Sequence, residues 1–166
     1  MLLNKSDSYK IKEALLHAIY IGNTQIAQFI LLHPQYNANF SVNNLNEGVP
    51  RFDSFWETQS TVDAQFSSDI TPIMLASHYN RAEIVQMLLD RGDHIEKPHD
   101  FYCGCLECIN RFEFDSLRNA QSRLNAYKGL ASEVYISLAS IDPILTSFVL
   151  RHEMIFLADK EKYFKV

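Results

Sequence analysis

Three cysteines and one histidine lie within ten residues of this chain. They are His99, Cys103, Cys105 and Cys108, and the 166 residues contain no other cysteine. Thiolate and imidazole groups are ligands that zinc prefers, and four of them complete the tetrahedral shell of a structural zinc ion. No position then stays open for a catalytic water. The spacing therefore predicts a structural Zn²⁺ site at these four residues.

Two alternatives to zinc stay open on spacing alone. Cys105 and Cys108 have the C-x2-C spacing of a redox pair, although a thioredoxin-like motif also needs a nearby βαβ pattern, which the sequence lacks. The thiols could also be ordinary buried side chains. A secreted disulfide framework is disfavoured, because its cysteines would be even in number and dispersed. The cysteine usage therefore favours the cytosol.

Composition and charge disfavour other classes of protein. The net charge is −5, so the chain lacks the basic footprint of a nucleic-acid partner. No stretch approaches the 18 or so apolar residues of a membrane span. The first residues, Met1-Leu2-Leu3-Asn4-Lys5, lack the apolar core of a signal peptide. We therefore expect a cytosolic chain, and any membrane part of the protein would lie outside this sequence.

The chain repeats itself, and the repeat would position the cluster. A segment from Glu13 aligns without gaps to one from Thr71, 58 residues later. In the second copy Thr71-Pro72 starts a helix, Asn80 ends it, and Gly92 closes an apolar stripe at helical spacing. T-P-I-M-L-A is typical of ankyrin repeats, whose period is near 33 residues. The first copy is degenerate, with Glu13-Ala14 in place of Thr-Pro.

These patterns predict an all-α fold of ankyrin-type helical hairpins. The offset between the two copies is longer than one ankyrin repeat. We interpret the extra residues as an inserted loop, and we expect its aromatic side chains to pack on the repeat. Asp142-Pro143 starts the last of three further helices. We expect a degenerate ankyrin repeat at 1–33, an inserted finger loop at 34–66, an ankyrin repeat at 67–97, a zinc-binding loop at 98–114 and a linker-helix region at 115–166.

Four segments follow one another in a specific order. S-S-D-I-T-P-I-M-L-A-S-H (Ser67–His78) precedes P-H-D-F-Y-C-G-C-L-E-C (Pro98–Cys108), then D-S-L-R-N-A-Q-S-R-L-N-A-Y-K-G-L-A-S (Asp115–Ser132) and Y-I-S-L-A-S-I-D-P-I-L-T-S-F (Tyr135–Phe148). This order resembles the N-terminal cytoplasmic domain of TRPC-type transient receptor potential cation channels. The resemblance covers nearly the whole chain and is loosest at 34–66.

The resemblance implies a subunit of a tetrameric, calcium-permeable cation channel that acts downstream of phospholipase C. It implies His99, Cys103, Cys105 and Cys108 as zinc ligands, the cytoplasmic face of the plasma membrane as location, and other channel subunits and cytosolic regulatory proteins as partners. No nucleic acid or small-molecule substrate is implied. The family's pore segments are not in this sequence, so the chain would serve tetramer assembly and gating regulation.

Two other functions compete with this reading. The chain could be a soluble ankyrin-repeat adaptor, or a truncated product, that binds channel subunits. A zinc or redox enzyme is disfavoured, since the sequence offers no open coordination site, no convincing general base and no Gly-rich phosphate loop. His17, His33, His78 and His152 are scattered along the chain. We therefore expect no enzymatic activity.

Overall fold

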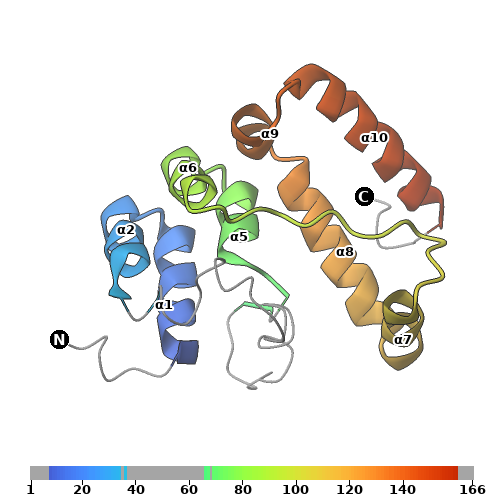
Figure 1. Cartoon of the computed structure of the whole chain (residues 1–166), viewed down its shortest axis with the longest axis horizontal. Coiled ribbons are helices and arrows are strands. Elements are labelled where there is room, and N and C mark those ends of the chain that lie inside the picture. Colours follow the sequence, from blue (N-terminus) through green and yellow to red (C-terminus); the bar gives the residue numbers. More distant parts are fainter. Residues whose placement is uncertain (1–7, 35, 37–65, 68, 161–166) are drawn as a thin grey trace.

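Every regular element in the described part of the chain is an α-helix (Figure 1). The computed structural model describes residues 8–34, 36, 66–67 and 69–160. The expected finger loop at 34–66 lies almost wholly outside these residues. The predicted all-α, ankyrin-type fold class is confirmed. The helices are α1 (Ser8–Ile21), α2 (Thr24–Leu32), α5 (Pro72–His78), α6 (Ala82–Asp90), α7 (Leu106–Phe114), α8 (Ser116–Leu130), α9 (Glu133–Ala139) and α10 (Pro143–Lys160).

Two helical hairpins, α1–α2 and α5–α6, form the repeat. Their tight turns need left-handed backbone, which Gly22 supplies at φ 82° and Asn80 at φ 51°. Thr71 caps α5 by accepting the Met74 N–H at 3.3 Å, and Pro72 occupies the first turn, where no hydrogen bond is lost. The residues expected to start and end the repeat helices are therefore found at the helix ends.

The two hairpins stack in register, α1 against α5 and α2 against α6. Arginines of the second hairpin reach unpaired carbonyls at the ends of the first. Arg81 donates to the Tyr20 carbonyl at 3.2 Å, and Arg91 to the Leu31 carbonyl at 2.6 Å. Apolar side chains from all four helices fill the space between them, among them Leu15, Ile19, Ala27, Ile84 and Leu88.

The C-terminal helices pack on the second hairpin. α8 lies against α5 and α9 against α6, and α10 then turns back over α8 and α9 (Figure 1). At Gly129, α8 comes close to the extended segment that follows α6. A Cβ atom added at this glycine would lie only 2.7 Å from Cδ1 of Ile95. A second, smaller core joins α8, α9 and α10 through Tyr127, Ile136, Leu150 and Leu157. None of the described helices is long and apolar enough to cross a membrane.

Thr71→Ala is expected to lower the free energy of unfolding by about 1 kcal/mol, because the first turn of α5 loses its cap. Urea unfolding followed by circular dichroism measures the change. Thr24→Ala is the matched control, since Thr24 follows the cap of α2, Asn23, and does not supply the capping bond itself. Equal losses in the two variants would contradict the capping role of Thr71.

Candidate metal centre

The four predicted ligands come together from an extended segment and the start of a helix. After α6 the chain runs extended along α8 toward α7 (Figure 1). His99 lies on this segment, Cys103 and Cys105 in the turn that follows, and Cys108 in the first turn of α7. The second half of the expected 98–114 loop is therefore helical, a difference from the sequence interpretation.

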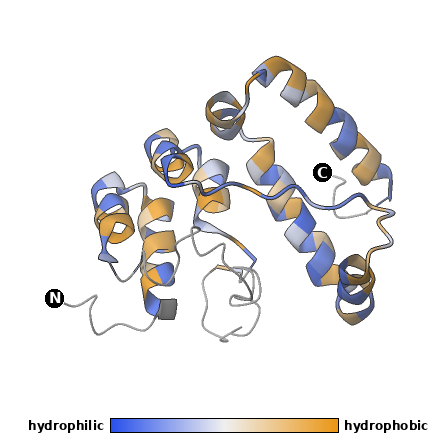
Figure 2. Ribbon diagram, viewed as in Figure 1, coloured by the Kyte–Doolittle hydropathy of each residue, from blue (hydrophilic) through white to orange (hydrophobic). Residues whose placement is uncertain are grey.

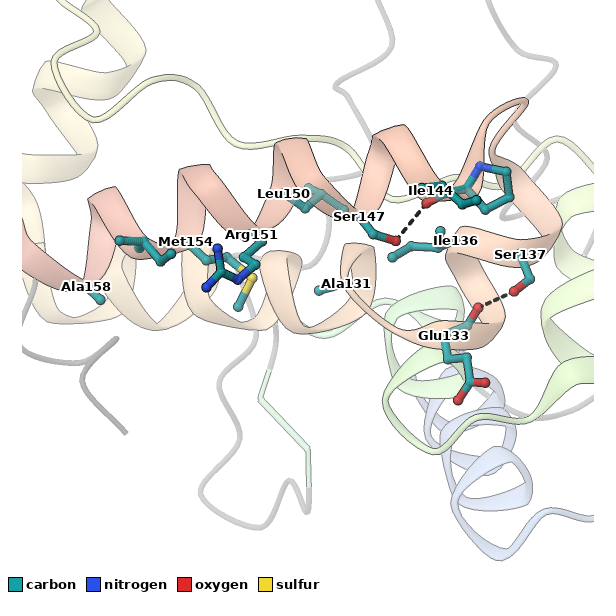
Figure 3. Close-up of a pocket in the computed structure, with 12 residues that line it drawn as sticks. Ala131, Glu133, Ile136, Ser137, Ile144, Ser147, Leu150, Arg151, Met154 and Ala158 are labelled. Atoms are coloured by element: carbon teal, nitrogen blue, oxygen red, sulfur yellow. Dashed lines mark hydrogen bonds between the residues drawn. The ribbon is translucent and has the colours of Figure 1, made fainter.

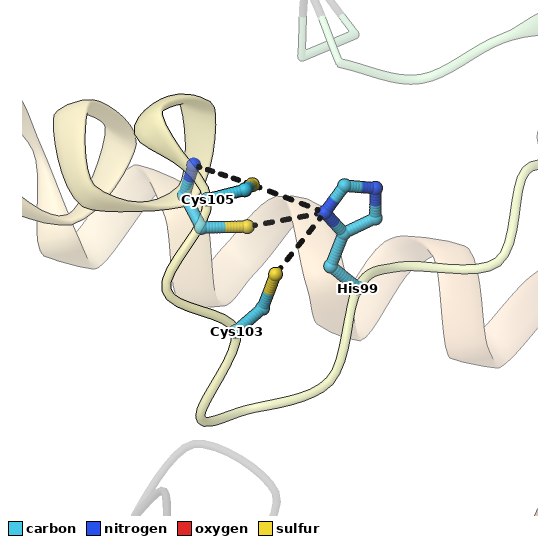
Figure 4. A group of neighbouring side chains, drawn as sticks. His99, Cys103 and Cys105 are labelled. Atoms are coloured by element: carbon cyan, nitrogen blue, oxygen red, sulfur yellow. Dashed lines mark hydrogen bonds between the residues drawn. The ribbon is translucent and has the colours of Figure 1, made fainter.

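The His99 imidazole faces all three thiols (Figure 4). Its Nδ1 atom lies 3.6 Å from Cys103 Sγ, 3.4 Å from Cys105 Sγ and 3.3 Å from Cys108 Sγ. All four ligand atoms lie within 4.8 Å of one another. A tetrahedral zinc ion with Zn–S near 2.3 Å and Zn–N near 2.0 Å would place nitrogen and sulfur about 3.5 Å apart. The four side chains are therefore close enough together to hold a metal ion.

Local hydrogen bonds shape the turn that carries the thiols. Asp100 accepts the Tyr102 N–H through Oδ1 at 2.9 Å and the Cys103 N–H through its carbonyl at 3.0 Å. Cys105 caps α7, with its Sγ accepting the Cys108 N–H at 3.4 Å. The thiol of Cys105 therefore has a structural task as well as a place among the ligands.

The protonation of the thiols fits a cluster made to hold a cation. The pKa of Cys105 is lowered to about 6, first by the Cys108 backbone N–H and then by hydrogen bonds from Cys108, His99 and Cys103. The pKa of Cys108 is raised to about 12, first by burial and then by the neighbouring thiols. Three thiolates so close together repel one another, and a divalent cation would offset that repulsion.

No second cluster of this kind occurs within the described residues. This is the single group there of three or more His, Cys, Asp or Glu side chains that could hold a metal. His78, by contrast, is half-buried between α5 and α8, where its Nε2 lies 2.8 Å from the Asn125 carbonyl oxygen. Burial lowers the pKa of His78, as expected of a packed interface side chain.

Comparison with known proteins decides the family. An ankyrin-repeat family model matches residues 68–99, and a model described as transient receptor ion channel II matches residues 103–165. The Short transient receptor potential channel 3 of Homo sapiens is 43% identical over 166 residues, 99% of this chain. This region belongs to the TRPC-type transient receptor potential family. The Transient receptor potential-gamma protein of Drosophila melanogaster is 42% identical over 154 residues, 93% of the chain.

The TRPC-type region spans less than a fifth of the length of these relatives, 18% of the human protein and 13% of the fly protein. The ankyrin match ends at His99 and the channel match begins at Cys103. The four candidate ligands therefore lie where the two matched segments meet, between the repeat and the C-terminal helices.

Contacts that the sequence did not predict hold the cluster's segment against α8 and α10 of this TRPC-type region. Lys97 donates to Glu153 on α10 at 2.5 Å, and the Tyr127 hydroxyl on α8 donates to the same carboxylate at 3.3 Å. The Arg123 guanidinium lies over the Phe101 ring, with its Cζ 5.4 Å from the ring centroid. Tyr102 packs edge-on to Phe156 of α10.

Glu153→Gln is expected to lower the pKa of Tyr127 from about 12 toward its ordinary value near 10. The carboxylate, after burial, is what raises that pKa, and glutamine removes its charge. NMR titration of tyrosine-labelled protein measures the shift. Glu133→Gln is the matched control, because Glu133 is exposed on α9. An unchanged Tyr127 titration in Glu153→Gln would contradict the contact.

Proposed function

We propose that this chain is the ankyrin-repeat portion of a receptor- and phospholipase C-operated, calcium-permeable cation channel subunit. It would serve tetramer assembly and gating regulation at the cytoplasmic face of the plasma membrane, with other channel subunits as partners. The observation that carries the proposal is the identity to the human channel over 99% of this chain, from the repeats through α10. The relatives are named as channels, and we propose no enzymatic activity for this region.

We also propose that His99, Cys103, Cys105 and Cys108 hold a structural zinc ion. The proposal rests on the donor set of three thiols and one imidazole, and on the nitrogen–sulfur distances of 3.3 to 3.6 Å. Zinc, when bound, would supply four fixed coordination bonds and no open site for chemistry. Two of these bonds would tie His99, at the far end of the extended segment that follows the repeat, to Cys108 on α7.

This link between His99 and α7 would complete a closed series of contacts between the repeat and the C-terminal helices. α8 packs on α5, α5 pairs with α6, and the extended segment leads from α6 back to α7 and α8. That segment has few apolar anchors of its own, Ile95 being buried with its N–H bonded to the Tyr135 hydroxyl at 3.0 Å. Fixing its far end would make the repeat and the C-terminal helices move as one body. A shape change in either would then reach the other.

Deletion of residues 68–165 from the full-length subunit tests the assembly role. Native gel electrophoresis should show loss of the tetramer, and calcium imaging should show loss of influx after stimulation of a phospholipase C-coupled receptor. A full-length subunit without the deletion is the reference for expression. Tetramers and influx that survive the deletion would contradict the proposed function.

A further inference from the structure

The extended segment that carries His99 has little burial to hold it in place. Its residues 93–100 are mainly hydrophilic (Figure 2), and Ile95 is the one residue among them that is buried. His99 itself is exposed, and its Nε2 atom has no hydrogen-bond partner among the described residues. A metal-bound histidine normally has a partner at its second ring nitrogen, which fixes the ring. The place of the His99 ring therefore depends on contacts made by the residues on either side of it.

Two contacts with α10 lie on either side of His99 in the sequence. Lys97, two residues before it, donates to the Glu153 carboxylate at 2.5 Å. Tyr102, three residues after it, packs edge-on to Phe156, with the ring centroids 6.2 Å apart. Glu153 and Phe156 are three residues apart, so they share one side of α10. The C-terminal end of this helix accordingly lies beside the far end of the extended segment (Figure 1).

These contacts use a different side of α10 from the open groove of about 680 Å³ between α9 and α10 (Figure 3). From α10 the groove is lined by Arg151 and Ala158, among others, but not by Glu153 or Phe156. Two residues turn an α-helix by about 200°, so Glu153 points away from the side that carries Arg151. The side of α10 that holds the segment can therefore be altered without changing the groove.

α8 supports the same arrangement. The Tyr127 hydroxyl donates to the Glu153 carboxylate at 3.3 Å, so this one carboxylate joins α8, α10 and the extended segment. Phe101, which lies between His99 and Cys103 in the sequence, packs against the second core. The three thiols, by contrast, belong to the following turn and to α7, which packs on α8. A bound metal would therefore join two pieces that are held separately, the His99 segment by α10 and the thiols by α7.

We propose that Glu153 and Phe156 of α10 are positioning residues for the metal centre, which hold Lys97 and Tyr102 and so keep His99 within reach of the thiols. The inference rests on the proposed zinc site and deepens it. Coupling between two linked equilibria is reciprocal. α10 in its place therefore raises the affinity for zinc, and bound zinc strengthens the attachment of α10. The metal centre then responds to the position of α10 as well as to that of the repeat.

Chelator competition on the purified full-length subunit tests this assignment. Zinc that stays bound is measured by elemental mass spectrometry as the chelator concentration rises. We expect the double variant Glu153→Ala/Phe156→Ala to bind zinc about tenfold more weakly than wild type, equivalent to about 1.4 kcal/mol. Groups that support metal ligands typically change the affinity by roughly 10- to 100-fold, and the lower end applies because the ion pair is partly exposed. The control Asp159→Ala/Phe148→Ala makes the same two substitutions at exposed positions of α10 and should keep the wild-type affinity.

Further measurements separate positioning from a general loss of structure. X-ray absorption at the zinc edge should show three sulfurs and one nitrogen around the zinc that the double variant still binds. Lys97→Arg keeps a cation for Glu153 and should keep the wild-type affinity, whereas Lys97→Met should lower it. Removal of zinc from the wild type should in turn speed hydrogen exchange in α10.

The possible outcomes distinguish this inference from the proposed zinc site. Equal zinc affinity in the wild type and in Glu153→Ala/Phe156→Ala overturns the positioning role alone and leaves the metal site standing. A wild-type subunit that holds no zinc overturns the metal site and the inference with it. An equal loss of affinity in the control pair, or in Lys97→Arg, also contradicts the positioning role, because the loss would not depend on the contacts that hold the segment.

Discussion

Replacing Cys105 with serine is expected to abolish stoichiometric zinc binding and to free α7 from its place against α8. The change removes one of four ligands and also the sulfur that caps α7 through the Cys108 N–H. Structural zinc sites contribute on the order of 10 kcal/mol in small zinc-finger peptides. Hydrogen exchange should show α7 losing most of its protection while α5 and α6 keep theirs.

Substitutions of two histidines, one a candidate ligand and one not, test whether the loss of protection in α7 depends on the metal site. His99→Asn removes a ligand and should reproduce the Cys105→Ser result. His94→Asn changes an exposed histidine five residues earlier, whose Nδ1 lies 3.3 Å from the Gly92 carbonyl, and should leave α7 protected. Unchanged exchange of α7 in both Cys105→Ser and His99→Asn would contradict a structural metal site.

Leu88→Ala is expected to lower the free energy of unfolding by about 2 to 5 kcal/mol, because the deletion leaves a cavity in the repeat core. Leu88 is 1% exposed on α6, the helix that contacts both α2 and α9. Urea unfolding measures the loss. Leu32→Ala on α2, where the side chain is 70% exposed, should change stability by less than about 0.5 kcal/mol. Similar losses in both variants would contradict the placement of this core.

Local signals in the sequence predicted the repeat well. Thr71 and Pro72 start α5, and Gly22, Asn80 and Gly92 take the left-handed backbone that their positions require. These features depend on residues a few positions apart, so the sequence displays them directly. The four candidate ligands were found for the same reason, since they occupy ten consecutive positions and the structure brings their ligand atoms together.

Features that depend on distant residues could not be predicted in this way. The pairing of Lys97 with Glu153 joins residues 56 apart, and no spacing rule indicates it. α7 begins inside the expected loop because a cysteine thiol, an unusual capping group, satisfies its first turn. α10 was expected as an apolar helix, but only the packing shows that one side stays uncovered by the described residues and forms the groove.

Zinc content and coordination of the purified wild-type protein test the central claim most directly. Elemental mass spectrometry gives the stoichiometry, and X-ray absorption at the zinc edge gives the ligands. We predict one zinc per chain with three sulfurs at about 2.3 Å and one nitrogen at about 2.0 Å. A well-folded protein without zinc, or zinc surrounded only by oxygen and nitrogen, would contradict the account.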